Sequence, residues 1–127
     1  MFTFKKTERL CTKKDIESLY SAGKHKTFPP LKIYWKKTVF EGPVRARVVI
    51  SVPKRIFKRA VDRNLIKRQI REVYRLNKNK LTDTFSEKQV QADLLVLFVG
   101  SKHPEITELE TALLKAFTVV TKDLNKE

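Results

Sequence analysis

The stretch 53–80 concentrates the residues whose chemistry is easiest to recognise in this chain. It holds eleven Lys or Arg residues, and only Asp62 and Glu72 oppose them. Clustered cations repel one another unless a counter-charge is supplied, and the phosphates of a nucleic acid supply it. A solvated charged helix usually alternates its charge signs, which this stretch barely does. We therefore expect a surface that neutralises phosphates.

A helical wheel separates the second half of this stretch into two faces. A helix predicted over about 60–77 places its cations on one arc of about 140°, with Tyr74 as the aromatic among them. The opposite side carries Leu65, Ile66, Ile70, Val73 and Leu76. This side is aliphatic and lacks the Trp or Phe that favour a membrane surface, so we expect it to pack on a core.

Length and composition predict one domain over 1–127. The chain has a formal net charge of +14, and 41% of its residues are hydrophobic, which is enough to fold. The N-terminus has charges where a signal peptide needs an apolar core, and no run approaches the roughly 18 apolar residues of a membrane span. Cys11 is the only cysteine, which excludes an internal disulfide and predicts a cytoplasmic location.

Apolar runs predict the elements that position the cations. In chain order these are a short helix through Ser21, a loop at 24–30, strands at 31–39 and 44–52, the basic helix, a connector at 79–91, a strand at 92–100 and a last helix after Pro104. We expect the first two strands to form an antiparallel hairpin. The strand at 92–100 is nearly all apolar, which places it centrally in the sheet. The prediction is an α+β fold of order α-β-β-α-β-α, with a small, mostly antiparallel sheet and helices mostly on one face.

The strand at 31–39 alternates between two kinds of residue. Leu31, Ile33 and Trp35 point one way, and Lys32, Tyr34 and Lys36 point the other. An aromatic among cations is typical of a surface for single-stranded RNA, but a solvated sheet face has the same pattern, so both interpretations stay open. In the first predicted helix, Ile16 and Tyr20 share an apolar stripe, whose spacing alone favours core packing.

The sequence offers no catalytic apparatus of its own. It contains no nucleophile elbow, no P-loop and no Cys/His cluster with metal-ligand spacing. His25 and His103 lie in predicted loops without an acidic residue placed to orient them. We also disfavour DNA binding in a major groove, because the apolar side embeds the basic helix in the domain. We therefore predict RNA binding without catalytic residues in the protein.

The run AVDRNLIKRQIR at 60–71 resembles the signature of the bacterial ribonuclease P protein subunit, in which A-V precedes R-N and K-R-x-x-R follows. The opening FKKTERLCTKKDIESLYSAG and the strand ADLLVLFVG are similar to other parts of that family. With gaps, the resemblance extends from about Phe4 to Gly100. It implies a small α/β sandwich with a left-handed crossover around the basic helix. It also implies a subunit of a ribonucleoprotein endonuclease that removes the 5′ leader from precursor tRNA.

The resemblance implies two sets of contact residues. The catalytic RNA would contact Lys54, Arg55, Arg63, Asn64, Lys67, Arg68, Arg71 and Arg75. A cleft for the precursor tRNA leader would contain Ile16, Tyr20, Lys32, Tyr34, Val49 and Ser51. Cleavage is assigned to the RNA subunit together with Mg²⁺, and the protein alone would bind no cofactor. The alternative is a structural or ribosomal-type RNA-binding protein without a role in turnover, which would need only the basic helix.

Two positions depart from the family pattern. Leu65 stands where the signature has Arg, which removes one expected phosphate contact. The wheel places Leu65 at the border of the apolar face, so we expect it to pack there. Phe57 stands where Gly is usual, in a loop that is one residue longer, which changes the approach to the basic helix.

Overall fold

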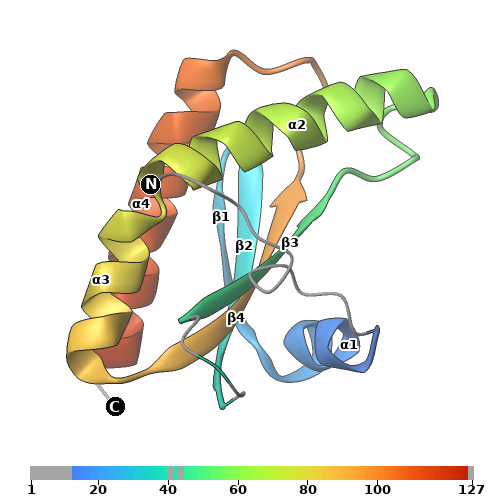
Figure 1. Ribbon diagram of the computed structural model, residues 1–127. Helices are drawn as coiled ribbons and strands as arrows, with labels where there is room; N and C mark the ends of the chain where they lie inside the picture. The colour runs from blue at the N-terminus through green and yellow to red at the C-terminus, as the bar shows by residue number, and fades with distance from the viewer. Residues whose placement is uncertain (1–12, 40–41, 43–44, 126–127) are drawn as a thin grey trace.

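The computed structural model describes residues 13–39, 42 and 45–125, which form a four-stranded sheet and four helices (Figure 1). The elements are α1 Lys13–Ala22, β1 Lys24–Phe28, β2 Leu31–Thr38, β3 Ala46–Ser51, α2 Ala60–Asn77, α3 Asn79–Lys88, β4 Gln91–Phe98 and α4 Ile106–Asn125. The predicted α+β class and the predicted bounds of the basic helix, which is α2, are confirmed.

The strand order in the sheet is β1-β2-β4-β3. β1 and β4 are both antiparallel to β2, whereas β3 runs parallel to β4. The sheet is mostly antiparallel, as predicted, but the predicted hairpin of β2 with β3 is wrong because β4 lies between them. Leu94, Leu95 and Val96 of β4 are each 1% exposed, and only a central strand buries both of its faces. α2 and α3 connect the parallel pair, and the left-handed sense of this connection stays a prediction.

Two segments extend the predicted order of elements. The predicted loop at 24–30 contains β1, an edge strand whose first four residues are exposed. The predicted connector at 79–91 contains α3, which buries Leu81 and Phe85. The predicted order α-β-β-α-β-α is therefore corrected to α-β-β-β-α-α-β-α. Both segments are rich in polar residues because much of each is exposed to solvent.

The main core lies between one face of the sheet and the helices α2, α3 and α4. Leu31, Ile33 and Trp35 point into it, as predicted. Tyr74 is also buried, with its ring centroid 6.0 Å from that of Phe117. The wheel had placed Tyr74 among the cations, and the packing of α4 against α2 corrects this.

The packed side of α2 is narrower than the wheel predicts. Leu65 and Leu76 are each 43% exposed. The prediction that Leu65 packs on the core is therefore wrong, because α4 and the sheet contact α2 mainly through Ile66, Ile70 and Val73. These two leucines, together with Val61, are apolar side chains on the exposed side of α2.

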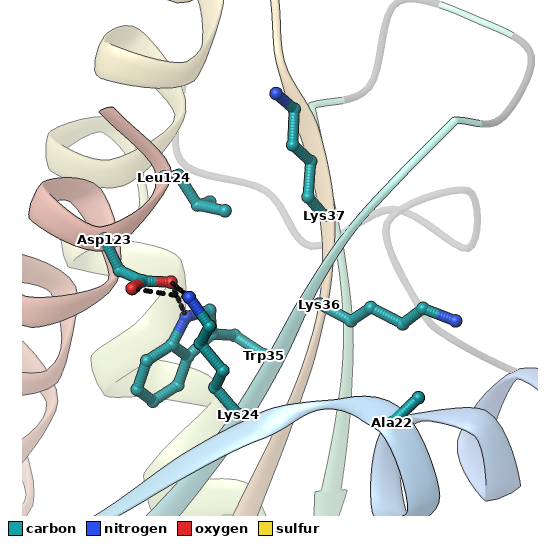
Figure 2. A pocket seen from close by; sticks show the side chains of 7 residues that line it. All are labelled: Ala22, Lys24, Trp35, Lys36, Lys37, Asp123 and Leu124. Carbon is teal, nitrogen blue, oxygen red and sulfur yellow. Dashed lines mark hydrogen bonds and ion pairs between the residues drawn. The ribbon is translucent and has the colours of Figure 1, made fainter. Parts of the chain in front are cut away.

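The end of α4 is tied to the sheet through Asp123. Its carboxylate accepts hydrogen bonds from Lys24 Nζ at 2.9 Å and from Trp35 Nε1 at 2.9 Å (Figure 2). Lys36, the neighbour of Trp35, points away from this carboxylate toward α1 (Figure 2). Trp35 thus contacts α4 and Lys36 contacts α1, on opposite faces of the sheet.

α1 packs on the other face of the sheet, so three of the four helices share one face, in agreement with the prediction that the helices lie mostly on one face. Leu19 is fully buried against Leu95, and Ile16, Tyr34 and Val49 pack around this pair. α1 covers only part of this face. No helix in the described ranges is long and apolar enough to cross a membrane.

Candidate nucleic-acid interface

The sheet face opposite the main core presents its side chains in rows across the strands. Residues directly opposite each other on paired strands point to the same face. One row contains Thr27, Lys32, Leu97 and Ser51, the next contains His25, Tyr34, Leu95 and Val49, and a third contains Lys36, Asp93 and Arg47. The register therefore brings four of the predicted leader residues to adjacent positions on one face.

Tyr34 lies at the centre of a cluster of rings. Its ring centroid is 5.0 Å from that of Tyr20 in an edge-to-face arrangement and 5.2 Å from that of His25. Lys32 Nζ lies 5.1 Å from the Tyr34 centroid, within the range of a cation–π interaction. We call the surface formed by Ile16, Tyr20, His25, Lys32, Tyr34, Val49 and Ser51 the ring surface. The structure brings all six predicted leader residues together on it.

His25 lies on this surface, although its position in a predicted loop gave no reason to assign it a role. The predicted loop at 24–30 is wrong, because 24–28 form β1, and a strand fixes the direction of each side chain in a way that a loop does not. In β1, His25 pairs with Tyr34 and Thr27 pairs with Lys32, so both lie on the face that carries the rings. The available signal was the residue spacing, since His25 and Thr27 are two apart and would share a face in a strand.

Tyr20 combines exposure with a raised pKa. Tyr20 is 48% exposed, so the core packing that its spacing alone favoured is wrong. Partial desolvation raises the pKa of Tyr20, Tyr34 raises it further, and the charge of Lys32 opposes both. Because the ordinary tyrosine pKa is already near 10, the phenol stays protonated at neutral pH and can donate a hydrogen bond to RNA.

Polar contacts at the third row hold α1 against the sheet. Arg47 donates to both carboxylate oxygens of Asp93, at 2.8 and 2.9 Å, and its Nη2 lies 3.6 Å from Asp15 Oδ2. Lys36 Nζ donates to Ser18 Oγ at 2.6 Å. Burial raises the pKa of Asp93, and the Arg47 guanidinium opposes this shift. These contacts position the helix that supplies Ile16 and Tyr20. Of the residues involved, only Lys36 was placed on this face by the sequence, and its contact with α1 was not predicted.

The predicted contacts to the catalytic RNA lie on α2 and in the turn before it. Lys54, Arg55, Asn64, Arg68 and Arg71 are exposed, and Lys67 is half-buried. We call these six residues the α2 surface. Within the part of the chain that the structure describes, the side chains of Asn64, Lys67, Arg68 and Arg71 form no hydrogen bond or ion pair. The three cations among them can therefore approach phosphates without first breaking an internal contact.

Arg63 and Arg75, also predicted as RNA contacts, have partners inside the protein. Arg63 Nη1 donates to the carbonyl oxygens of Phe57 and Lys58, each at 2.8 Å. Arg75 Nε donates to Glu72 Oε2 at 3.1 Å, and this contact lowers the pKa of Glu72. Arg63 thus fixes the loop that leads into α2, while part of the Arg75 charge is compensated. Their contact with RNA stays a prediction.

The Phe57 ring packs the longer loop against two other aromatic side chains. Its ring centroid is 5.9 Å from that of Phe98 and 4.9 Å from that of His103. His103 Nε2 in turn lies 3.2 Å from Asp62 Oδ1, which anchors this ring to the first turn of α2. The loop is therefore fixed by an aromatic contact as well as by Arg63. No group of three or more His, Cys, Asp or Glu that could hold a metal ion occurs among the described residues.

The fold and these two surfaces define a small α+β RNA-binding protein. A sequence profile of the family described as Ribonuclease P matches residues 4–121. The ribonuclease P protein component of Porphyromonas gingivalis is 33% identical over 115 residues, which are 91% of this chain and 84% of that protein. The chain therefore belongs to the ribonuclease P protein family. Proteins of this family form a ribonucleoprotein with a catalytic RNA, and their role is tRNA 5′ processing.

Solved structures confirm the fold. The RNase P protein of Staphylococcus aureus is similar with a TM-score of 0.70 and 22% sequence identity, over 89% of this chain and 94% of that one. The RNase P protein of Thermotoga maritima is similar with a TM-score of 0.68 and 22% identity, over 87% of this chain and 94% of that one. The α+β sandwich predicted from the resemblance is therefore confirmed.

Proposed function

We propose that the ring surface binds the single-stranded 5′ leader of precursor tRNA while the α2 surface binds the catalytic RNA near its active site. The observation that carries this proposal is the cluster around Tyr34, in which Tyr20, His25 and Lys32 all lie within 5.2 Å of its ring. Unpaired bases stack on aromatic side chains, and a nearby cation balances the phosphate that links them.

The α2 surface supports the second half of the proposal. Lys67, Arg68 and Arg71 present cations at helical spacing on a rigid element, and Lys54 and Arg55 extend them into the preceding turn. Such a surface gains affinity by releasing counterions from phosphates. It gives little base specificity, which is appropriate for contact with the backbone of a folded RNA.

The position of the two surfaces allows both RNAs to bind at once. α2 lies on one face of the sheet and α1 on the other (Figure 1). The rings of Tyr20, His25 and Tyr34 lie on the face that carries α1. No residue belongs to both surfaces, so the leader does not compete with the catalytic RNA for a side chain. The protein can therefore add leader affinity to an enzyme whose chemistry belongs to the RNA.

We also propose which metal ion takes part in cleavage and where in the cell the protein acts. Mg²⁺ acts with the RNA subunit, where it can stabilise the attacking and leaving oxygens of the cleaved phosphate. The protein contributes charge neutralisation and leader binding, and it holds no cofactor. Its place of action is the cytoplasm, where Cys11 stays reduced; the single cysteine supports this location.

The test is cleavage of precursor tRNA by a bacterial ribonuclease P RNA at low Mg²⁺, with and without the protein. The substrates are one precursor with leaders of graded length, from a single nucleotide to several. We expect the protein to stimulate cleavage more as the leader lengthens, until the ring surface is filled. Stimulation that does not depend on leader length would remove the leader-binding half of the proposal. Tight RNA binding without any stimulation would favour the structural RNA-binding alternative.

A further inference from the structure

The outer side of α2 contains a hollow of about 510 Å³ near its N-terminal end. Its lining consists of Arg59, Val61, Asp62, Asn64, Leu65 and Arg68. Val61 and Leu65 lie one helical turn apart and are 64% and 43% exposed. An apolar floor of this kind is unexpected on a surface that otherwise carries cations, and a phosphate gains nothing from contact with it.

The rim of the hollow is polar and carries both signs of charge. Arg59, whose side chain is 77% exposed, donates from Nε to Asp62 Oδ2 at 2.9 Å. This hydrogen bond lowers the pKa of Asp62, so its carboxylate is ionised at neutral pH. Arg59 Nη2 also donates to Asp62 Oδ1 at 3.3 Å, so part of this negative charge is compensated, as part of the Arg75 charge is. A carboxylate oxygen has two lone pairs, so Asp62 can still accept a hydrogen bond from an N–H group in the hollow. Asn64 adds an amide that can both donate and accept.

We propose that this hollow binds one unpaired nucleobase of the catalytic RNA. A nucleobase has a flat, largely apolar face for Val61 and Leu65, and a polar edge for Asn64 and the Asp62 carboxylate. Arg59 and Arg68 bracket the hollow and are placed for the phosphates on either side of that base. The base must be unpaired, because a duplex would present its phosphates and groove edges to the helix. This inference rests on the proposed contact between α2 and the catalytic RNA.

The main test compares two leucines of α2 that have the same exposure. Leu65→Asn removes one of the two apolar side chains of the floor, and Leu76→Asn makes the same change outside the hollow, where the leucine is also 43% exposed. Neither variant changes the net charge. We expect Leu65→Asn to weaken binding of a bacterial ribonuclease P RNA about fivefold with an unchanged salt dependence, and Leu76→Asn to have little effect. Leu65→Met, which keeps an apolar side chain, should restore the affinity. Equal affinities of the two Asn variants would overturn the proposal.

Chemical probing of the RNA gives a second, direct test. Dimethyl sulfate, kethoxal and a carbodiimide together report the Watson–Crick edges of all four bases when these are unpaired. Wild-type protein and Leu76→Asn should protect one unpaired base that Leu65→Asn leaves reactive. If no base responds to Leu65→Asn in this way, the hollow holds no nucleobase.

Two further measurements separate this inference from its alternatives. Sedimentation of the free protein detects a second copy seated on the hollow. A dimer that Leu65→Asn abolishes without loss of RNA affinity would assign the hollow to contact between copies and overturn the proposal. Wild-type stimulation of precursor cleavage is measured with the same RNA. If stimulation is present and Leu65→Asn binds like wild type, the base site fails while the proposed function stands.

Discussion

The α2 surface and the ring surface offer an RNA different physical interactions. The α2 surface carries five cations and no aromatic side chain. The ring surface carries three rings and a single lysine, Lys32. Phosphate contacts lose affinity steeply as salt rises, because they depend on counterion release. Stacking of a base on an aromatic ring neutralises no phosphate and therefore releases no counterions. The salt dependence of binding therefore distinguishes which surface an RNA occupies.

The two regions also differ in how they are held. α2 packs into the main core through Ile66, Ile70 and Val73, so its surface persists as long as the domain is folded. The ring surface depends on α1, which rests on the separate small cluster around Leu19 and Leu95 and on the polar contacts of the third row. We therefore expect that a change in α1 can abolish the proposed leader binding while the fold and the proposed contact with catalytic RNA remain.

The largest expected effect comes from Leu19→Ala, which breaks the support of the ring surface alone. Removing a fully buried leucine costs about 2–5 kcal/mol, and here the loss falls on the docking of α1. We expect hydrogen exchange to speed up in α1 while α2 and β4 stay protected. The leader-dependent part of precursor affinity should disappear, with catalytic RNA affinity close to wild type.

Leu109→Ala is the matched control for that variant, because Leu109 is equally buried but belongs to the main core. It should lower global stability and weaken both RNA contacts together. If Leu19→Ala behaved in the same way, the two regions would form one cooperative unit and the distinction between them would fail.

Tyr34→Ala is expected to have the next largest effect, because it removes the ring at the centre of the cluster. Loss of one stacked base corresponds to about 1–3 kcal/mol in the affinity for precursor tRNA. Tyr34→Phe keeps the ring and should retain most of that affinity. Binding of mature tRNA, which lacks the leader, should not change. An equal loss for precursor and mature tRNA would exclude leader recognition by Tyr34.

Arg68→Ala and Arg71→Ala are expected to give the smallest effects on affinity, about 1 kcal/mol each at physiological salt. Their signature is the slope of log K against log salt for the catalytic RNA, which each variant should reduce by about 0.9. Lys115→Ala removes an exposed cation on α4 that belongs to neither surface, and it should leave the slope unchanged. A wild-type slope in Arg71→Ala would exclude a direct phosphate contact there.

Local patterns in the sequence predict the elements that carry the site. The 3.6-residue period of 60–77 gives α2 its bounds, and the apolar run of β4 places that strand centrally. The alternation along β2 separates Tyr34 from Ile33 and Trp35. In each case, the side that a residue faces follows from the periodicity of its own element. The family resemblance then selected Ile16, Tyr20, Val49 and Ser51, which the structure brings together.

Features that depend on distant parts of the chain could not be predicted in this way. The pairing of β3 with β4 joins residues such as Arg47 and Asp93, whose contact no local pattern encodes. A helical wheel gives the direction of Arg63 but cannot show that the carbonyls of Phe57 and Lys58 lie within its reach. It also cannot show that α4 covers Tyr74 and leaves Leu65 exposed.

The contact of Trp35 with Asp123 gives the protein an internal optical probe. Trp35 is the only tryptophan in the chain, it is 5% exposed, and it donates to a residue of α4. It follows Tyr34 directly in β2 but points to the opposite face of the sheet. Its fluorescence therefore reports the docking of α4 on the sheet and shifts to the red when that docking is lost. An RNA that occupies the ring surface leaves this emission unquenched, since the whole sheet separates it from the indole.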